Sequence, residues 1–124
     1  MELTERVQTH FVESIAVKQL AMDILAPQVA IAAERMLACL MNEGKILACG
    51  NGVMAALGQL FVTQLVHKFD TERPSLPAIS LTADSLLLSG IAAETGYDDI
   101  YAKQVRALGQ HGDILLLLSA EGND

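Results

Sequence analysis

The residues best suited to chemistry lie in a short turn, Gly50-Asn51-Gly52, which follows an apolar run and precedes a helical pattern. A glycine-rich turn from a strand into a helix can direct backbone N–H groups at a phosphate. The same residues also suit a plain tight turn, and so short a glycine pattern is weak support for a site. The turn alone therefore leaves a phosphate loop and a structural turn both open.

Other reactive side chains lack the neighbours that metal or nucleophile chemistry needs. His10, His67 and His111 have no metal-ligand spacing among them. Cys39 and Cys49 each lie in an apolar run, which is typical of buried free thiols in a reducing compartment. No histidine close in sequence would activate Cys49. The sequence therefore predicts no metal, no cofactor and no thiol nucleophile.

The composition describes one globular domain with an aliphatic core. The chain has 124 residues, is 52% hydrophobic and only 4% aromatic, which excludes general disorder. Its 8 basic and 15 acidic residues give a net charge of −7, which repels nucleic acid and anionic membranes. The start lacks a signal-peptide core, and the uninterrupted apolar runs, such as 114–118, are too short to span a membrane. We expect a cytoplasmic protein with no direct nucleic-acid or membrane contact.

Two leading helices are expected before an alternation of strands and helices. Apolar spacing predicts an amphipathic helix over 3–25, and Pro27 predicts the start of a second one, ending near 42. Short apolar runs predict strands at 45–49, 78–81 and 114–118. Further helices are expected at 53–69, at 85–93 with Asp84 as N-cap, and at 98–108 after a break at Gly96. This order predicts an α/β fold with a parallel sheet.

Three stretches of the chain, KILACGNG (45–52), HKFDTERPSLPAISL (67–81) and YAKQVRALG (101–109), resemble the sugar isomerase (SIS) domain family. Within it they resemble the phosphoheptose isomerase branch. The last two are most similar to a non-enzymatic member, the initiator-associating protein that binds the replication initiator DnaA. The resemblance covers essentially the whole chain. It implies a three-layer, doubly wound parallel sheet of the flavodoxin-like SIS type, incomplete at its C-terminal end and preceded by two interface helices.

The resemblance also implies a phosphosugar site at the carboxyl ends of the strands, where open α/β sheets bind ligands. Its residues here would be Gly50, Asn51, Gly52, Asp84, Ser119, Gly122 and Asn123. Two hydroxyl positions of the family's second phosphate loop hold Glu121 and Asp124 in this chain. A carboxylate ~4 Å from a phosphate charge costs about 1 kcal/mol in water. We therefore expect sugar-phosphate binding to be weak or absent.

The family's metal and catalytic pair is a His and, four residues later, a Glu, on the helix after the first turn. Leu60 and Gln64 occupy those positions here; Leu60 has no lone pair, and Gln64 is a negligible base. We expect a non-catalytic SIS protein that acts through protein contacts, with the replication initiator as one partner. The alternative is a phosphoheptose isomerase that converts sedoheptulose 7-phosphate into a heptose 7-phosphate. A second alternative is a sugar-phosphate sensor without turnover.

The chain is expected to form one SIS-like domain over 1–124, with a helical oligomerisation segment (1–43) and a parallel α/β part (44–124). The leading helices carry more apolar residues than so short a chain can cover, which indicates a homotetramer or a dimer. The residues expected to face a partner subunit are Val7, Phe11, Ile15, Val29, Met36 and Leu40. Family members continue beyond residue 124 with two more strand–helix units, so strand 114–118 would lie at an open sheet edge. A fragment and a shortened natural product both remain open.

Overall fold

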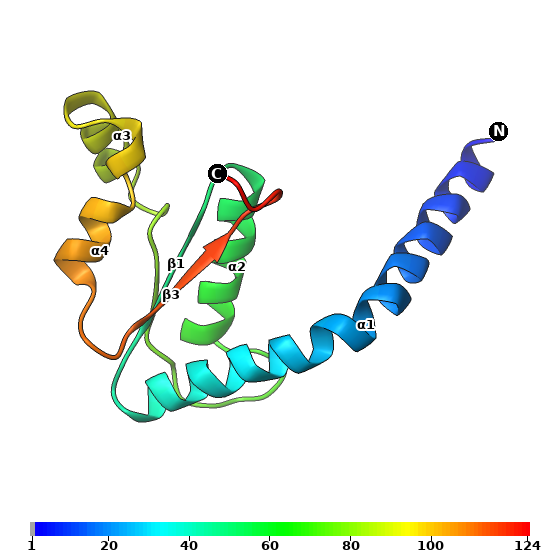
Figure 1. Cartoon of the computed structure of the whole chain (residues 1–124), viewed down its shortest axis with the longest axis horizontal. Coiled ribbons are helices and arrows are strands. Elements are labelled where there is room, and N and C mark those ends of the chain that lie inside the picture. Colours follow the sequence, from blue (N-terminus) through cyan, green and yellow to red (C-terminus); the bar gives the residue numbers. More distant parts are fainter. Residues whose placement is uncertain (1) are drawn as a thin grey trace. The chain divides into compact units, whose positions relative to one another are not determined.

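The computed structural model describes residues 2–124, which form two compact units (Figure 1). One unit lies within residues 2–35 and is helical; the other spans Met36–Asp124 and contains the sheet. The elements are α1 (Leu3–Met41), β1 (Ile46–Gly50), α2 (Val53–Val66), β2 (Ala78–Ser80), α3 (Ser85–Glu94), η1 (Tyr97–Asp99), α4 (Ala102–Leu108) and β3 (Ile114–Leu118).

A single helix, α1, takes the place of the two leading helices expected from the sequence. Pro27 lies inside it, and Figure 1 draws α1 as one continuous helix. A proline removes its own N–H, so the carbonyl of Asp23 loses a partner, while the Leu, Ala and Met residues nearby favour helix. The predicted interruption at Pro27 was therefore wrong.

Helix α1 is also the one helix within residues 2–124 that is long and apolar enough to cross a membrane, judged by length and composition alone. Its most apolar window has a mean hydropathy of 1.5 and is 6% buried. One such helix is weak support for a membrane span, because helices of soluble proteins pass the same test. The cytoplasmic location expected from the sequence stays a prediction.

The three strands form a parallel sheet in the order β2-β1-β3. The central strand β1 pairs with β3 along its whole length, from Ile46 opposite Ile114 to Gly50 opposite Leu118. Every residue of β1 is buried, which explains why this strand is an unbroken apolar run rather than an alternating one. The α/β class and the parallel sheet predicted from the sequence are confirmed.

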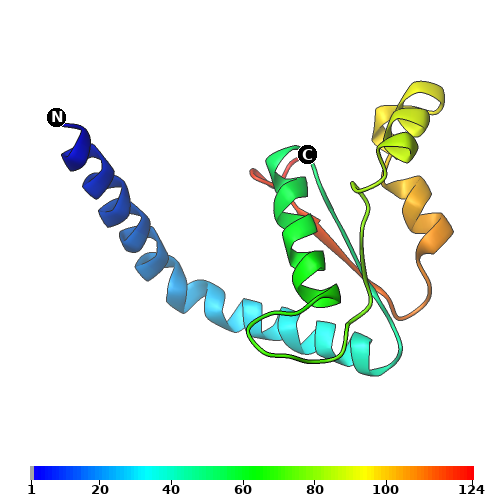
Figure 2. The same cartoon turned by 180° about the vertical axis from the view of Figure 1, so that it is seen from behind.

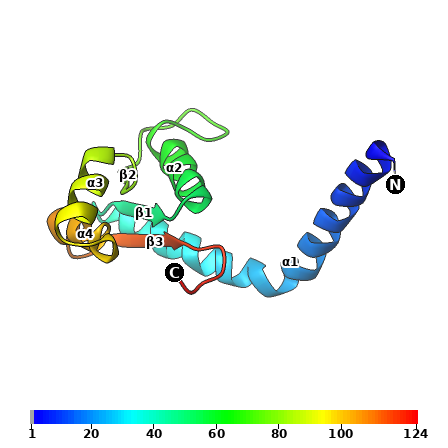
Figure 3. The ribbon, with the colours of Figure 1, turned by 90° about the horizontal axis from the view of Figure 1, so that it is seen from above.

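Helices cover the two faces of this sheet. On one face, Gly58 of α2 lets the helix approach closely, since an added Cβ would lie only 3.3 Å from Leu118 Cδ1. Figure 3 shows α2 over that face. On the other face Tyr101, at the start of α4, packs against the cluster that holds Leu47 and Cys49. The sheet core is therefore aliphatic, with one phenol and one thiol at its carboxyl end.

The ends of the middle helices follow the sequence in part. Asp84 caps α3, accepting hydrogen bonds from the backbone N–H groups of Leu86 and Leu87 at 3.1 Å each. Gly96, which follows α3, has a φ of 141°, a backbone conformation that glycine adopts without strain. The single helix expected over 98–108 is instead the short η1 followed by α4. The predicted N-cap is confirmed, whereas the predicted continuity of 98–108 was wrong.

Hydrogen bonds from Arg73 hold the loop that follows α2 (Figure 2) to the end of that helix. The guanidinium of Arg73 donates to the backbone carbonyls of Gln64 at 2.5 Å and Leu65 at 2.9 Å. These carbonyls belong to the last turn of α2, which has no further intrahelical donors for them. Lys68 and Glu72 form an exposed ion pair in the same loop. The arginine thus fixes where α2 stops and where the chain turns toward β2.

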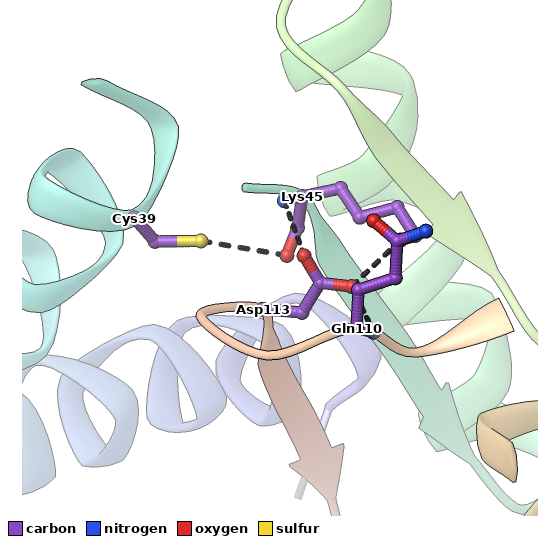
Figure 4. Close-up of polar contacts among 4 residues, drawn as sticks. All are labelled: Cys39, Lys45, Gln110 and Asp113. Atoms are coloured by element: carbon purple, nitrogen blue, oxygen red, sulfur yellow. Dashed lines mark hydrogen bonds and ion pairs between the residues drawn. The ribbon is translucent and has the colours of Figure 1, made fainter. Parts of the chain in front are cut away.

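A carboxylate clamp, Asp113 with Lys45, joins the starts of β1 and β3 (Figure 4). Asp113 accepts a hydrogen bond from the backbone N–H of Lys45 at 2.9 Å, one from Lys45 Nζ at 2.6 Å and one from the backbone N–H of Gln110 at 2.8 Å. The Lys45 side-chain bond, with the two backbone bonds, lowers the pKa of Asp113 to about 2. The clamp thereby holds the two strands in register at their amino ends.

We predict that Asp113→Asn lowers stability in a pH-dependent way. Because the folded-state pKa of about 2 lies below the ordinary value of 3.8, the stabilisation is complete above that ordinary value and is lost as pH falls through about 2. The urea midpoint of the variant should fall below that of the wild type near neutral pH, and the gap should close as pH approaches 2. Asp23→Asn, on an exposed part of α1, is the matched control. A gap that stays constant with pH would show that Asp113 titrates normally.

Candidate functional site

The chain turns that follow β1 and β3 meet at the same edge of the sheet. Since β1 ends at Gly50 opposite Leu118, the turn Gly50–Gly52 and the segment after Leu118 leave the sheet side by side. They enclose a cavity of about 610 Å³. Its lining is Cys49, Gly50, Asn51, Tyr97, Asp98, Ile100, Tyr101, Leu117, Leu118, Ser119, Gly122 and Asp124. This is the edge at which parallel α/β sheets bind ligands.

The structure brings together part of the residue set expected from the sequence. Gly50, Asn51, Ser119 and Gly122 line the main cavity. Gly52 lines a smaller cavity of about 260 Å³, which also includes Gly50 and Asn51. Asp84 and Asn123 line neither cavity, and the Asp84 carboxylate is engaged as the cap of α3. The role of the whole set in ligand binding stays a prediction.

The first turn can bind an anion through its backbone N–H groups. Gly52 has a φ of 57°, which glycine adopts without strain, and it starts α2 with no side-chain cap. The backbone N–H groups of Met54 and Ala55 already donate to the carbonyls of Asn51 and Gly52, at 3.1 and 3.0 Å. An anion would therefore bind to the N–H groups that precede them, where the helix dipole also favours negative charge.

The second turn is shaped by Ser119. Its hydroxyl oxygen accepts a hydrogen bond from the backbone N–H of Gly122 at 2.8 Å, which closes the turn. A serine hydroxyl that accepts one bond still has its own hydrogen to donate. Ser119 can therefore hold the turn and offer a donor to the cavity at the same time.

The charges at the cavity wall are negative. Asp98 and Asp124 both line the cavity, and no Lys or Arg is among the lining residues. Glu121, the other acidic residue noted in the second turn, does not line it. A phosphate in this cavity is consequently attracted by backbone groups and repelled by carboxylates.

Sequence reasoning missed the aromatic wall formed by Tyr97 and Tyr101. The hydroxyl of Tyr101 donates to the carbonyl of Gly50 at 2.5 Å and lies 3.1 Å from Asn51 Oδ1. Burial, and to a lesser degree nearby Cys49 and Tyr97, raises the pKa of Tyr101, so the hydroxyl keeps its proton. The only signal for Tyr101 was its place in the family-like stretch 101–109, which carries no indication of this contact.

Gln104 is a second residue that the sequence did not reveal. It is buried, and its side-chain amide donates to the carbonyls of Leu81 at 2.8 Å and Ile100 at 2.9 Å. A polar residue buried in an aliphatic core needs such partners. Gln104 thereby holds α4 to the end of β2 and helps to fix the position of Tyr101 at the start of α4.

Leu60 and Gln64 do not form part of either cavity. Leu60 is 53% exposed on α2, and the backbone carbonyl of Gln64 is engaged by Arg73. Within residues 2–124, no group of three or more His, Cys, Asp or Glu side chains could hold a metal ion. The residues present therefore do not fit the metal that the family resemblance implies.

The fold and the cavity define a class: a parallel α/β protein with a cavity of mixed polar and apolar lining at the carboxyl ends of its strands. A family model described as SIS domain matches residues 10–124. The chain therefore belongs to the SIS domain family, as its motifs led us to expect.

Relatives in this family are named as enzymes. The chain is 56% identical over 123 residues to a phosphoheptose isomerase of Laribacter hongkongensis, and 48% identical over 123 residues to one of Chromohalobacter salexigens. Each match covers 99% of this chain, which spans 63% and 62% of the two relatives' lengths.

Solved structures agree with this placement. A phosphoheptose isomerase from Francisella tularensis superposes with a TM-score of 0.89 at 40% identity, over 96% of this chain and 62% of that one. A phosphoheptose isomerase from Neisseria gonorrhoeae also gives a TM-score of 0.89, at 48% identity, over 98% of this chain and 63% of that one.

The expectation of a non-catalytic partner protein was wrong. The relatives and structural neighbours are named phosphoheptose isomerase, which supports the enzymatic alternative. The expectation rested on Leu60 and Gln64. Because neither side chain lines a cavity, their identity does not describe what the cavity walls can do.

We predict that Asp124→Ser strengthens the binding of inorganic phosphate in this cavity. Removing a carboxylate ~4 Å from a phosphate charge should gain about 1 kcal/mol, or about fivefold in Kd. Isothermal titration at low ionic strength measures the change. Glu121→Ser removes the same charge from a residue outside the cavity lining and should have a smaller effect. Equal affinities for the wild type and Asp124→Ser would place the phosphate away from this wall.

Proposed function

We propose that this protein is a phosphoheptose isomerase, which converts sedoheptulose 7-phosphate into a heptose 7-phosphate. The observation that carries the proposal is the 56% identity to the Laribacter hongkongensis phosphoheptose isomerase across 99% of this chain. The chain spans 63% of that relative, so the activity, the substrate and the partners of the whole protein belong to the proposal.

An interconversion of ketose and aldose moves a hydrogen between two adjacent carbons and shifts the carbonyl from one carbon to the other. It needs groups that hold the sugar hydroxyls and a base that takes the proton. Asn51 and Ser119 supply hydrogen-bonding groups at the cavity, and Asp98 and Asp124 supply carboxylates. The uncapped start of α2 supplies backbone N–H groups for the phosphate. We therefore assign proton transfer to the cavity wall rather than to α2.

Turnover is tested directly by incubating the chain with sedoheptulose 7-phosphate and measuring the aldose product. We expect conversion above a protein-free blank, together with thermal stabilisation by the substrate. Asn51→Ala, which removes a polar group of the cavity, should reduce both signals. Stabilisation without turnover would contradict the isomerase proposal and favour a sugar-phosphate sensor. The absence of both signals would contradict each of these functions.

We also propose that α1 associates with a second copy of the chain. Val7, Phe11, Ile15 and Val29 are between 48% and 68% exposed, as is expected of side chains reserved for an interface. Met36 and Leu40, the other expected contacts, are half-buried. The edge strand β3 adds the exposed side chain of Leu115. These surfaces support the homo-oligomer predicted from the sequence, a tetramer or a dimer.

Light scattering at micromolar concentration should give the mass of a dimer or a tetramer. The double variant Phe11→Ser with Ile15→Ser removes two exposed apolar side chains and should shift the mass toward the monomer. Gln8→Ser, an exposed polar position on the same helix, is the control and should leave the mass unchanged. A wild-type chain that is monomeric at this concentration would contradict the association.

A further inference from the structure

The hydroxyl of Tyr101 cannot serve both of its neighbours as a donor. It lies 2.5 Å from the carbonyl oxygen of Gly50 and 3.1 Å from Asn51 Oδ1. A phenol has one hydrogen, and the shorter contact, to a carbonyl that can only accept, uses it. The contact with Asn51 then brings two oxygens together with no hydrogen between them.

A half-turn of the Asn51 side-chain amide removes this conflict. The oxygen and nitrogen of an amide have nearly the same shape, and their placement is settled by the hydrogen bonds around them. With Nδ2 toward Tyr101, the amide donates to a lone pair of the phenol oxygen. The hydroxyl then donates to Gly50 and accepts from Asn51, so each group is satisfied.

This orientation determines which side-chain atom of Asn51 faces the cavity. With Nδ2 engaged by Tyr101, Oδ1 turns away from the phenol. Asn51 lines both cavities at this edge of the sheet, so its free carbonyl oxygen is available there. An amide carbonyl accepts hydrogen bonds, which a sugar hydroxyl can donate and a phosphate oxygen cannot.

We propose that Tyr101 is a positioning residue that orients Asn51 so that its side-chain oxygen accepts a hydrogen bond from a sugar hydroxyl rather than contacting the phosphate. This inference rests on the proposed function, because it concerns the sugar-phosphate substrate of that function. Under this proposal, Asn51 binds the hydroxyl groups of the sugar, and backbone N–H groups at the start of α2 bind the phosphate.

Tyr101→Phe removes only the hydroxyl and tests the proposal. We expect it to weaken binding of sedoheptulose 7-phosphate about fivefold, the effect of one hydrogen bond of ordinary strength, and to leave binding of inorganic phosphate unchanged. Arg106→Gln is the control, because Arg106 is an exposed residue of α4 that lines neither cavity, and it should bind both ligands as the wild type does. Equal losses for the sugar phosphate and inorganic phosphate would overturn the assignment.

A double-mutant cycle shows whether the Tyr101 hydroxyl affects ligand affinity through Asn51 or through the Gly50 carbonyl. If Tyr101 acts by orienting Asn51, Tyr101→Phe should cause no further loss of affinity in an Asn51→Ala background. A loss that persists there would mean that the hydroxyl works by shaping the turn, and the proposal would fail.

Nuclear magnetic resonance of the ligand-free chain gives a readout independent of turnover. The side-chain NH₂ protons of Asn51 should exchange more slowly in the wild type than in Tyr101→Phe, because one of them is hydrogen-bonded to the phenol. Identical exchange in the two proteins would overturn the orientation. If slow exchange and the cycle hold but no turnover is found, the proposed function fails and the orientation stands. If turnover is found without them, only this inference fails.

Discussion

The clamp between Asp113 and Lys45 is the constraint on which the geometry of the site depends. One carboxylate receives the backbone and side-chain donors of Lys45 and the backbone N–H of Gln110, and so sets the position at which β3 begins beside β1. A slip of one residue would send every side chain of β3 to the opposite face. An all-aliphatic strand cannot exclude such a slip by its own pattern, because Ile and Leu occur at all of its positions. The specificity that the strand lacks is therefore supplied by a polar contact just before it.

The register carries this constraint along the sheet to the opposite edge. Because β1 and β3 stay paired to Gly50 and Leu118, the glycine turn and the Ser119 turn leave the sheet together and enclose one cavity. Tyr101 links that edge to α4 through the Gly50 carbonyl, and Gln104 fastens α4 to the end of β2. The walls are thus held by backbone-directed hydrogen bonds, while the side chains that face the cavity remain available for a ligand.

Much of this fold could be predicted from the sequence, because its signals are local. Short apolar runs marked the strands, and Asp84 marked the start of α3. Pro27 wrongly predicted a break between two helices, because a long helix tolerates the loss of one hydrogen bond. The site was harder, since Tyr101 and Asn51 are 50 positions apart and meet only after β1 and α4 pack together. A contact between residues so far apart in the chain leaves no repeating pattern in a single sequence from which it could be predicted.

The functional expectation failed for a related reason. Two side chains on α2, Leu60 and Gln64, were weighed as if they stood at the cavity wall, yet neither contributes to it. Beside the apolar Ile100, Leu117 and Leu118, the wall contains Asp98 and Asp124 with two phenols, and no Lys or Arg. Such a wall discriminates against free phosphate and favours a ligand whose hydroxyls donate hydrogen bonds. Under the proposed function, the hydroxyls of the sugar phosphate would face the acidic residues and its phosphate would face the start of α2, where the helix dipole offsets the negative charge.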